Sequence, residues 1–165
     1  MGDVMAISKG LLLVGAFVLA LGGCVNEPQQ YNDVHTGVSA GASKRYPVYQ
    51  NLLVSVYGQA FVATKGNETK YGIYVNQIAT GMGWSFFHSA YSFGVQLPYE
   101  RGNSNVMGCG GGCTLQEQGG VLLTAQQFSQ GAATGMEIKL VGSGNSVIIR
   151  IPAAAFQEAL ALRPS

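Results

Sequence analysis

The sequence is poor in charge, which narrows the range of partners it can bind. Charged residues make up only 10% of its 165 residues, and the formal net charge is +1. Typical soluble domains carry roughly 25% charged residues. The sequence has no run of lysine or arginine and no acidic tail. Because proteins bind nucleic acid through clustered cations that neutralise phosphates, we do not expect this chain to do so.

Residues suited to catalysis are also few. The chain has two histidines, and His88 is the one good candidate for a general base in the predicted domain. Alternation along a strand is expected to point Ser85 and Ser89 to the face opposite His88. No Gly-x-Ser-x-Gly nucleophile elbow is present. Four glutamates are expected to be solvated, with a general acid/base pair among them as the alternative: Glu100, Glu117, Glu137 and Glu158. We therefore expect no enzyme, with a hydrolase that uses His88 as the weaker alternative.

A short apolar leader precedes the first cysteine. The run Leu11–Leu21 follows Lys9 and ends in Leu21–Cys24, with the sequence Leu-Gly-Gly-Cys. The run is too short to span a bilayer, which takes roughly 20 apolar residues. This three-part layout resembles a bacterial lipoprotein signal. An ordinary secretory signal is the alternative, and Asp3 leaves open a translation start at Met5 rather than Met1.

The lipoprotein resemblance has consequences for the mature chain. It implies cleavage after Gly23, acylation of Cys24, and stable anchoring through several acyl chains. Val25 stands where an aspartate would imply retention in the inner membrane, so the resemblance implies the outer membrane of a Gram-negative bacterium. The expected location is the periplasmic side, with the cell exterior as an alternative.

Two further cysteines remain, Cys109 and Cys113, separated by three glycines. With Cys24 assigned to acylation, an even number of cysteines is left, which predicts a disulfide in an oxidising compartment. A pair of free thiols is the alternative. A soft-metal or haem site built from these cysteines, His88 and Met107 is disfavoured, because oxidised cysteines are not thiolate ligands. We expect no metal and no cofactor.

The chain divides into a signal peptide (1–23), a lipidated flexible tether (24–45) and one β-rich domain (46–165). Small and polar residues without periodicity predict the tether, and His35 within it is expected to be exposed. The predicted strands lie at 48–57, 60–64, 71–75, 84–93 and 121–123, in two short arms of 105–118 that fold back at the glycines, and in a hairpin over 136–151. Residues 101–105 are expected to form a loop.

Two helices are expected among these strands. Thr124 and Gln127 fit a capping box that starts a helix over 125–130, with Gly131 as its stop. Pro152 begins a C-terminal helix over 153–162. The predicted fold is mainly β, or α+β: an antiparallel sheet or sandwich with a short internal helix and a C-terminal helix.

The segment from Trp84 to Phe93 is the most aromatic in the chain. Alternation places Trp84, Phe86 and His88 on one strand face, and Phe87 and Tyr91 on the other. The favoured interpretation is hydrophobic core, and the alternative is a groove for peptide, glycan or lipid. The candidate partner or ligand surface is Trp84, Phe86, Phe87, His88 and Tyr91. Tyr46, Tyr49, Tyr57 and Tyr74 are further surface candidates.

The mature domain is similar to uncharacterised small lipoproteins of Gram-negative bacteria. The residues that carry the resemblance are Trp84–Tyr91, the pair Cys109 and Cys113, and the junction Ile151–Pro152. The resemblance implies no particular activity. The leading hypothesis is therefore a membrane-anchored, non-enzymatic module that binds or braces another envelope protein. The alternative is a carrier of lipid or haem, with an apolar cavity behind Trp84 and Phe87.

Overall fold

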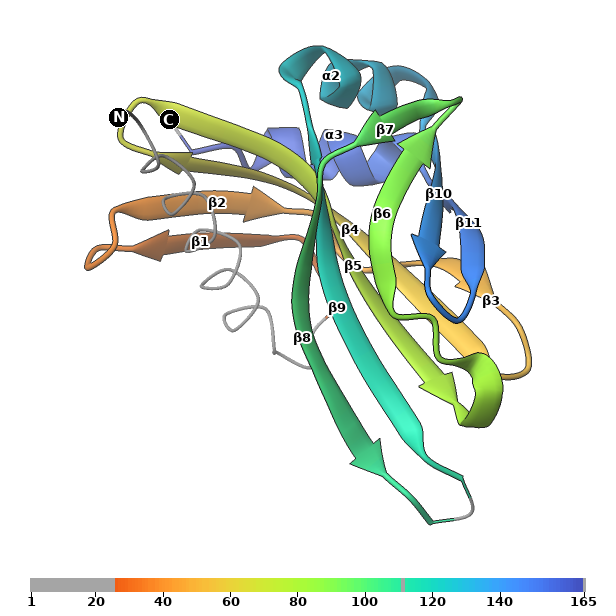
Figure 1. The fold of residues 1–165 in the computed structure, drawn as a ribbon. Helices are drawn as coiled ribbons and strands as arrows, with labels where there is room; N and C mark the ends of the chain where they lie inside the picture. Colours follow the sequence, from red (N-terminus) through yellow and green to blue (C-terminus); the bar gives the residue numbers. More distant parts are fainter. Residues whose placement is uncertain (1–25, 111, 165) are drawn as a thin grey trace, which may run out of the picture.

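The structure is a computed structural model, which describes residues 26–110 and 112–164. It contains two antiparallel sheets and two α-helices, which confirms the predicted fold class (Figure 1). The larger sheet has the order β1 (Gln29–Asp33), β2 (Val38–Ala42), β4 (Val54–Lys65), β5 (Glu68–Thr80), β9 (Thr114–Leu123) and β8 (Tyr99–Gly108), and β3 (Tyr46–Gln50) also pairs with β4. The smaller sheet has the order β11 (Ser146–Ile151), β10 (Met136–Gly142), β6 (Phe87–Ser92) and β7 (Val95–Leu97).

The main core lies where the larger sheet packs against the smaller sheet and the helices α2 (Ala125–Thr134) and α3 (Ala153–Ala161) (Figure 1). The smaller sheet buries alternate residues such as Ile138, Leu140 and Ile149, a period that marks a sheet with one buried face. A second apolar cluster lies on the opposite face of the larger sheet, around Phe61 and Tyr74.

The predicted tether is wrong over residues 29–42, which form β1 and β2. β2 pairs with β4 from Val38 opposite Lys65 to Ala42 opposite Phe61. A Cβ added to Gly41 would lie 2.3 Å from the carbonyl oxygen of Leu162, just beyond α3. Gly41 therefore reflects close packing against the C-terminal segment, and Ala40 and Ala42 pack into the second apolar cluster, so these small residues do not indicate flexibility. His35 is exposed in the β1–β2 turn, as predicted, and Cys24 lies outside the described residues.

Three further differences have local causes. Asn51 interrupts the predicted strand 48–57, because its side-chain oxygen accepts hydrogen bonds from the backbone N–H groups of Leu53 and Val54. The predicted loop 101–105 is part of β8, which pairs with β9 through a bulge between Arg101 and Ser104. Gly119 was expected to separate two strands but lies inside β9. A glycine is needed there because the Tyr99 ring occupies the space that a side chain would fill.

The capping box of Thr124 and Gln127 is confirmed, with both reciprocal hydrogen bonds present. The helix continues past the predicted stop and ends at Gly135, whose φ of 76° lies in the left-handed region. Gly131 instead lets the Phe156 ring of α3 approach α2. The 136–151 hairpin and the C-terminal helix are confirmed.

Candidate functional site

The predicted alternation of the Trp84–Phe93 segment is confirmed up to His88 and is wrong beyond it, because a bulge shifts the register. Phe87 pairs with Gly142 and Ser89 pairs with the adjacent Val141, which leaves His88 as an extra residue. Phe87 is 1% exposed and joins the core with Ala90, whereas His88 points to solvent. Phe87 is therefore not available to a partner.

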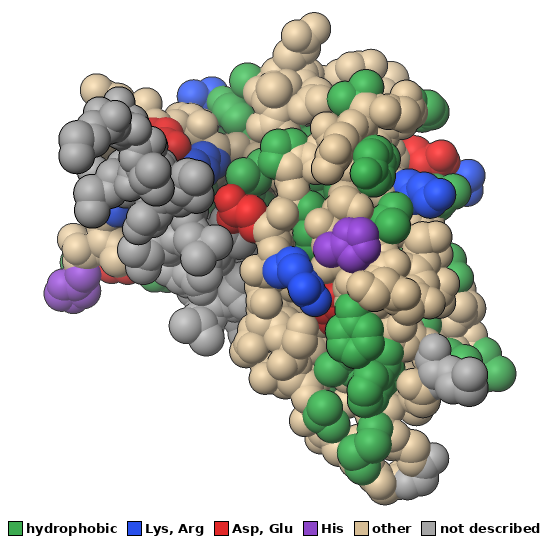
Figure 2. All heavy atoms as spheres, in the orientation of Figure 1, with side chains coloured by type: hydrophobic (Ala, Val, Ile, Leu, Met, Phe, Trp, Pro, Cys, Tyr) green, Lys and Arg blue, Asp and Glu red, His purple; other side chains and the backbone are tan. Residues whose placement is uncertain are grey.

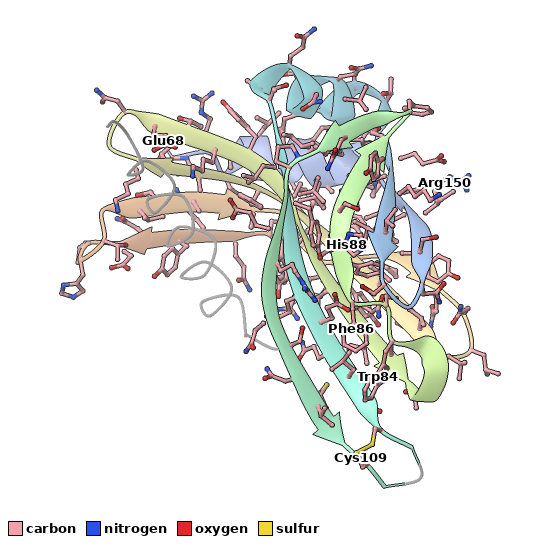
Figure 3. All side chains as sticks on the ribbon, viewed as in Figure 1. Glu68, Trp84, Phe86, His88, Cys109 and Arg150 are labelled. Atoms are coloured by element: carbon pink, nitrogen blue, oxygen red, sulfur yellow. A yellow bond between two sulfur atoms is a disulfide. The ribbon has the colours of Figure 1, made fainter. Side chains whose placement is uncertain are left out.

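An exposed apolar surface lies beside this bulge. It consists of the exposed side chains of Phe86, Val106 and Met107 and the half-buried ring of Trp84, and we call it the aromatic patch. The Trp84 and Phe86 rings meet edge to face with centroids 6.0 Å apart. Figure 3 shows both on the lower part of the molecule, between His88 and the hairpin tip that carries Cys109. Figure 2 shows apolar side chains gathered over this part of the β8–β9 hairpin.

The backbone beneath the patch is held by a buried carboxylate. Glu117 of β9 is 3% exposed, and its carboxylate accepts hydrogen bonds from the backbone N–H groups of Phe86, at 2.9 Å, and of Phe87. Phe86 has a φ of 53°, a strained conformation for a residue with a side chain. Glu117 thus fixes the turn that directs the Phe86 ring outward while the next ring enters the core.

The surroundings of Glu117 explain its electrostatics. Burial raises the pKa of its carboxyl group, and the two backbone hydrogen bonds and the Arg101 charge oppose that rise. Burial also raises the pKa of Tyr99, and the nearby Glu117 charge adds to this effect. Next to them, the Ser85 hydroxyl donates to the side-chain oxygen of Gln77 at 3.0 Å. The prediction that Glu117 is solvated is therefore wrong.

Strand β8 forms one edge of the patch and of the larger sheet. It is the last strand in the sheet order, and among the residues that the structure describes it pairs only with β9. Its residues 101–108 are all exposed, and 102–108 contain no charged residue and no proline. Two register shifts, between Arg101 and Ser104 and between Val106 and Gly108, interrupt this edge, and the regular stretch 104–106 between them, with no charge and no proline, leaves backbone groups open to a further strand.

The remaining candidate residues are His88, its serine neighbours and the two cysteines of the β8–β9 hairpin. The Ser89 hydroxyl lies 3.2 Å from Nδ1 of His88. The bulge brings these two side chains together, so the prediction of opposite faces is wrong. Among the residues that the structure describes, no carboxylate bonds to His88, and no three His, Cys, Asp or Glu side chains are grouped to hold a metal. The Cys109 and Cys113 sulfurs are 2.16 Å apart, at disulfide distance, at the tip of the β8–β9 hairpin.

Tyr91 lies apart from the patch, on the outer face of the smaller sheet, where it lines a groove with Phe93. The predicted surface of Trp84, Phe86, Phe87, His88 and Tyr91 is therefore divided into separate regions. Tyr74, predicted at the surface, is buried in the second apolar cluster. Two features were not predicted from the sequence: the contribution of Val106 and Met107 to the aromatic patch, and the support that Glu117 gives to the Phe86 turn. These roles depend on how distant strands pack against one another, which local patterns do not show.

No family model, curated protein or solved structure matches this chain. Within 26–110 and 112–164, no helix is both long and apolar enough to cross a membrane.

Proposed function

We propose that this protein is a lipid-anchored lipoprotein of the bacterial outer membrane, whose β-domain is a non-enzymatic module that binds another envelope protein. The docking surface is the free edge of β8 together with the aromatic patch. The partner supplies an extended segment that adds to β8 as a further strand and places apolar side chains against Trp84 and Phe86.

One observation carries this proposal: the exposed, uncharged segment 102–108 of an edge strand lies beside the exposed Phe86 ring and the half-buried Trp84 ring. Strand addition takes its affinity from main-chain hydrogen bonds and its specificity from side-chain contacts next to the edge. The Phe86 ring and the Val106 side chain offer such contacts. The absence of charge on 102–108 favours an apolar or neutral partner segment over a strongly charged one.

The structure of the turn at Phe86 also supports a surface role. Its left-handed backbone costs stability, and a buried carboxylate is used to hold it. Strained backbone conformations are common at functional positions, and they persist only where the surrounding structure holds the backbone in place. The Leu21–Cys24 motif and the apolar run before it support the part of the proposal that concerns a lipid anchor at Cys24.

The proposal is tested with two variants and a matched control. Phe86→Asn removes the ring but keeps a residue that tolerates a left-handed backbone. Val106→Lys places a charge on the edge strand. Val34→Lys makes the same change at an exposed valine of the β1–β2 turn.

The measurement is the amount of the protein's envelope partner that co-purifies with each variant in mild detergent. We expect Phe86→Asn and Val106→Lys to reduce it at least tenfold and Val34→Lys to leave it unchanged. Equal recovery by all three variants would show that the docking surface lies elsewhere.

A further inference from the structure

The turn between β6 and β7 holds a phenylalanine in an unfavourable position. Ser92 pairs with Val95, so Phe93 and Gly94 form a two-residue hairpin turn, with φ values of 46° and 84°. Turns with two positive φ values favour Asn-Gly, and a bulky residue there is strained. The Phe93 side chain is also 89% exposed. Neither the turn nor the core therefore accounts for this ring.

Phe93 stands over a groove on the outer face of the smaller sheet. Two adjoining hollows, each of about 450 Å³, share Phe93 and Glu137 as lining residues. The first is also lined by Tyr91, Val141 and Ile148, and the second continues along β10 and β11 toward Pro152. The groove is thus long and open, with aromatic and aliphatic side chains on its walls.

The polar groups of the groove carry a net positive charge. Glu137 and Arg150 form an ion pair at 2.9 Å on neighbouring strands, and Figure 3 shows Arg150 on the outer side of the smaller sheet. Lys139 lies opposite Tyr91 and forms no ion pair with any residue in the described part of the chain. One cation is therefore left for an acidic group of a ligand.

The position of the groove argues against a peptide strand as its occupant. The groove runs over β10, which is paired on one side with β6 and on the other with β11. The main-chain groups of β10 are thus engaged, and strand addition needs a free edge. A ligand in this groove is recognised by side chains alone: by rings that cover apolar ligand faces, and by charged groups that bind hydroxyls and carboxylates.

We propose that this groove binds an acidic glycan chain. The Phe93 and Tyr91 rings stack against the C–H faces of sugar rings, Glu137 and Arg150 bond to hydroxyls, and Lys139 pairs with a carboxylate. The site is separate from the β8 edge and does not depend on the partner protein proposed above.

The test uses two labelled tetrasaccharides with the same backbone. One is the neutral N-acetylglucosamine tetramer, and the other alternates N-acetylglucosamine with N-acetylmuramic acid, which adds carboxylates. Binding to the full chain in detergent is followed by fluorescence anisotropy. We expect the acidic probe to bind several-fold more tightly, with an advantage that salt and Lys139→Gln both remove.

Phe93→Asn is the decisive variant, because asparagine suits the turn. We expect it to weaken both probes about tenfold while leaving the protein folded and more resistant to urea. Leu52→Asn, which removes a 99% exposed apolar side chain from the loop before β4, is the control and binds as the wild type does.

Three results would overturn the proposal: no binding of either probe, equal binding by Phe93→Asn and the wild type, or equal affinity for both probes. A neutral pentapeptide that displaces the acidic probe and binds more tightly would also overturn it, since the groove would then be a peptide site.

Discussion

Removal of the Glu117 side chain tests how the aromatic patch is held. In Glu117→Ala, the N–H groups of Phe86 and Phe87 lose their acceptor. A buried donor left without a partner costs about 1–3 kcal/mol. The Phe87 N–H bears that full cost, while the less buried Phe86 N–H can reach water. We therefore expect a loss of about 2–4 kcal/mol, a large part of the roughly 5–15 kcal/mol by which such domains are stable.

Urea unfolding measures this loss, and the single tryptophan reports on the patch directly. Trp84 packs against Phe86, so its emission is expected to shift to longer wavelength when the turn loosens. Glu117→Gln keeps one acceptor oxygen and is expected to lose about half as much stability. The control Glu68→Ala removes an exposed carboxylate and is expected to change stability by less than about 0.5 kcal/mol. A Glu117→Ala protein within about 0.5 kcal/mol of the wild type, with unchanged emission, would refute the reasoning.

Three further predictions concern the same fold. Because burial raises the folded-state pKa of Glu117, the folded protein binds its proton more tightly than the unfolded chain. The contribution of Glu117 to the free energy of unfolding is therefore greatest below the unfolded pKa of about 4.3, and it falls as the pH rises through the folded pKa. Urea titrations from about pH 4 to 7 should show this decline in the wild type and not in Glu117→Gln. Thr124→Ala removes the helix cap and is expected to lower stability in urea by about 1 kcal/mol, and an unchanged midpoint would contradict the capping role. Gly119→Ala places a Cβ 2.1 Å from the Tyr99 hydroxyl, so we expect a loss of about 1–3 kcal/mol by thermal unfolding, against little change for Gly110→Ala at an open position.

Local patterns predicted several elements of the fold correctly. The 136–151 hairpin was predictable because apolar alternation and a Gly-Ser-Gly-Asn turn occur within one short segment. The capping box was predictable because both of its partners lie within four residues. The cysteine pair was predictable for the same reason, since its partners are four positions apart.

The features that were missed depend on segments far apart in the sequence. The register of β6 is set by its bulge against β10, so alternation alone placed Phe87 and His88 on opposite faces correctly but misplaced Ser89 and Tyr91, which follow the bulge. The strand at 38–42 has small residues because Leu162 packs against Gly41 on one face and Phe61 and Tyr74 pack with Ala40 and Ala42 on the other, contacts that composition does not reveal. Glu117 is buried because other strands cover it, so its function as the support of the Phe86 turn could not be derived from its own neighbours in the chain.

The central claim is that β8 accepts a strand from an envelope partner. Site-specific photo-crosslinkers placed in intact cells at 104, 105 and 106 in turn, with the crosslinked peptides sequenced, test it most directly. Strand addition predicts one partner segment, whose crosslinked position moves by one residue with each step along β8, and no crosslink from a probe at Val34. Crosslinks that scatter over unrelated partners, or that stay at one partner residue as the probe moves, would contradict it.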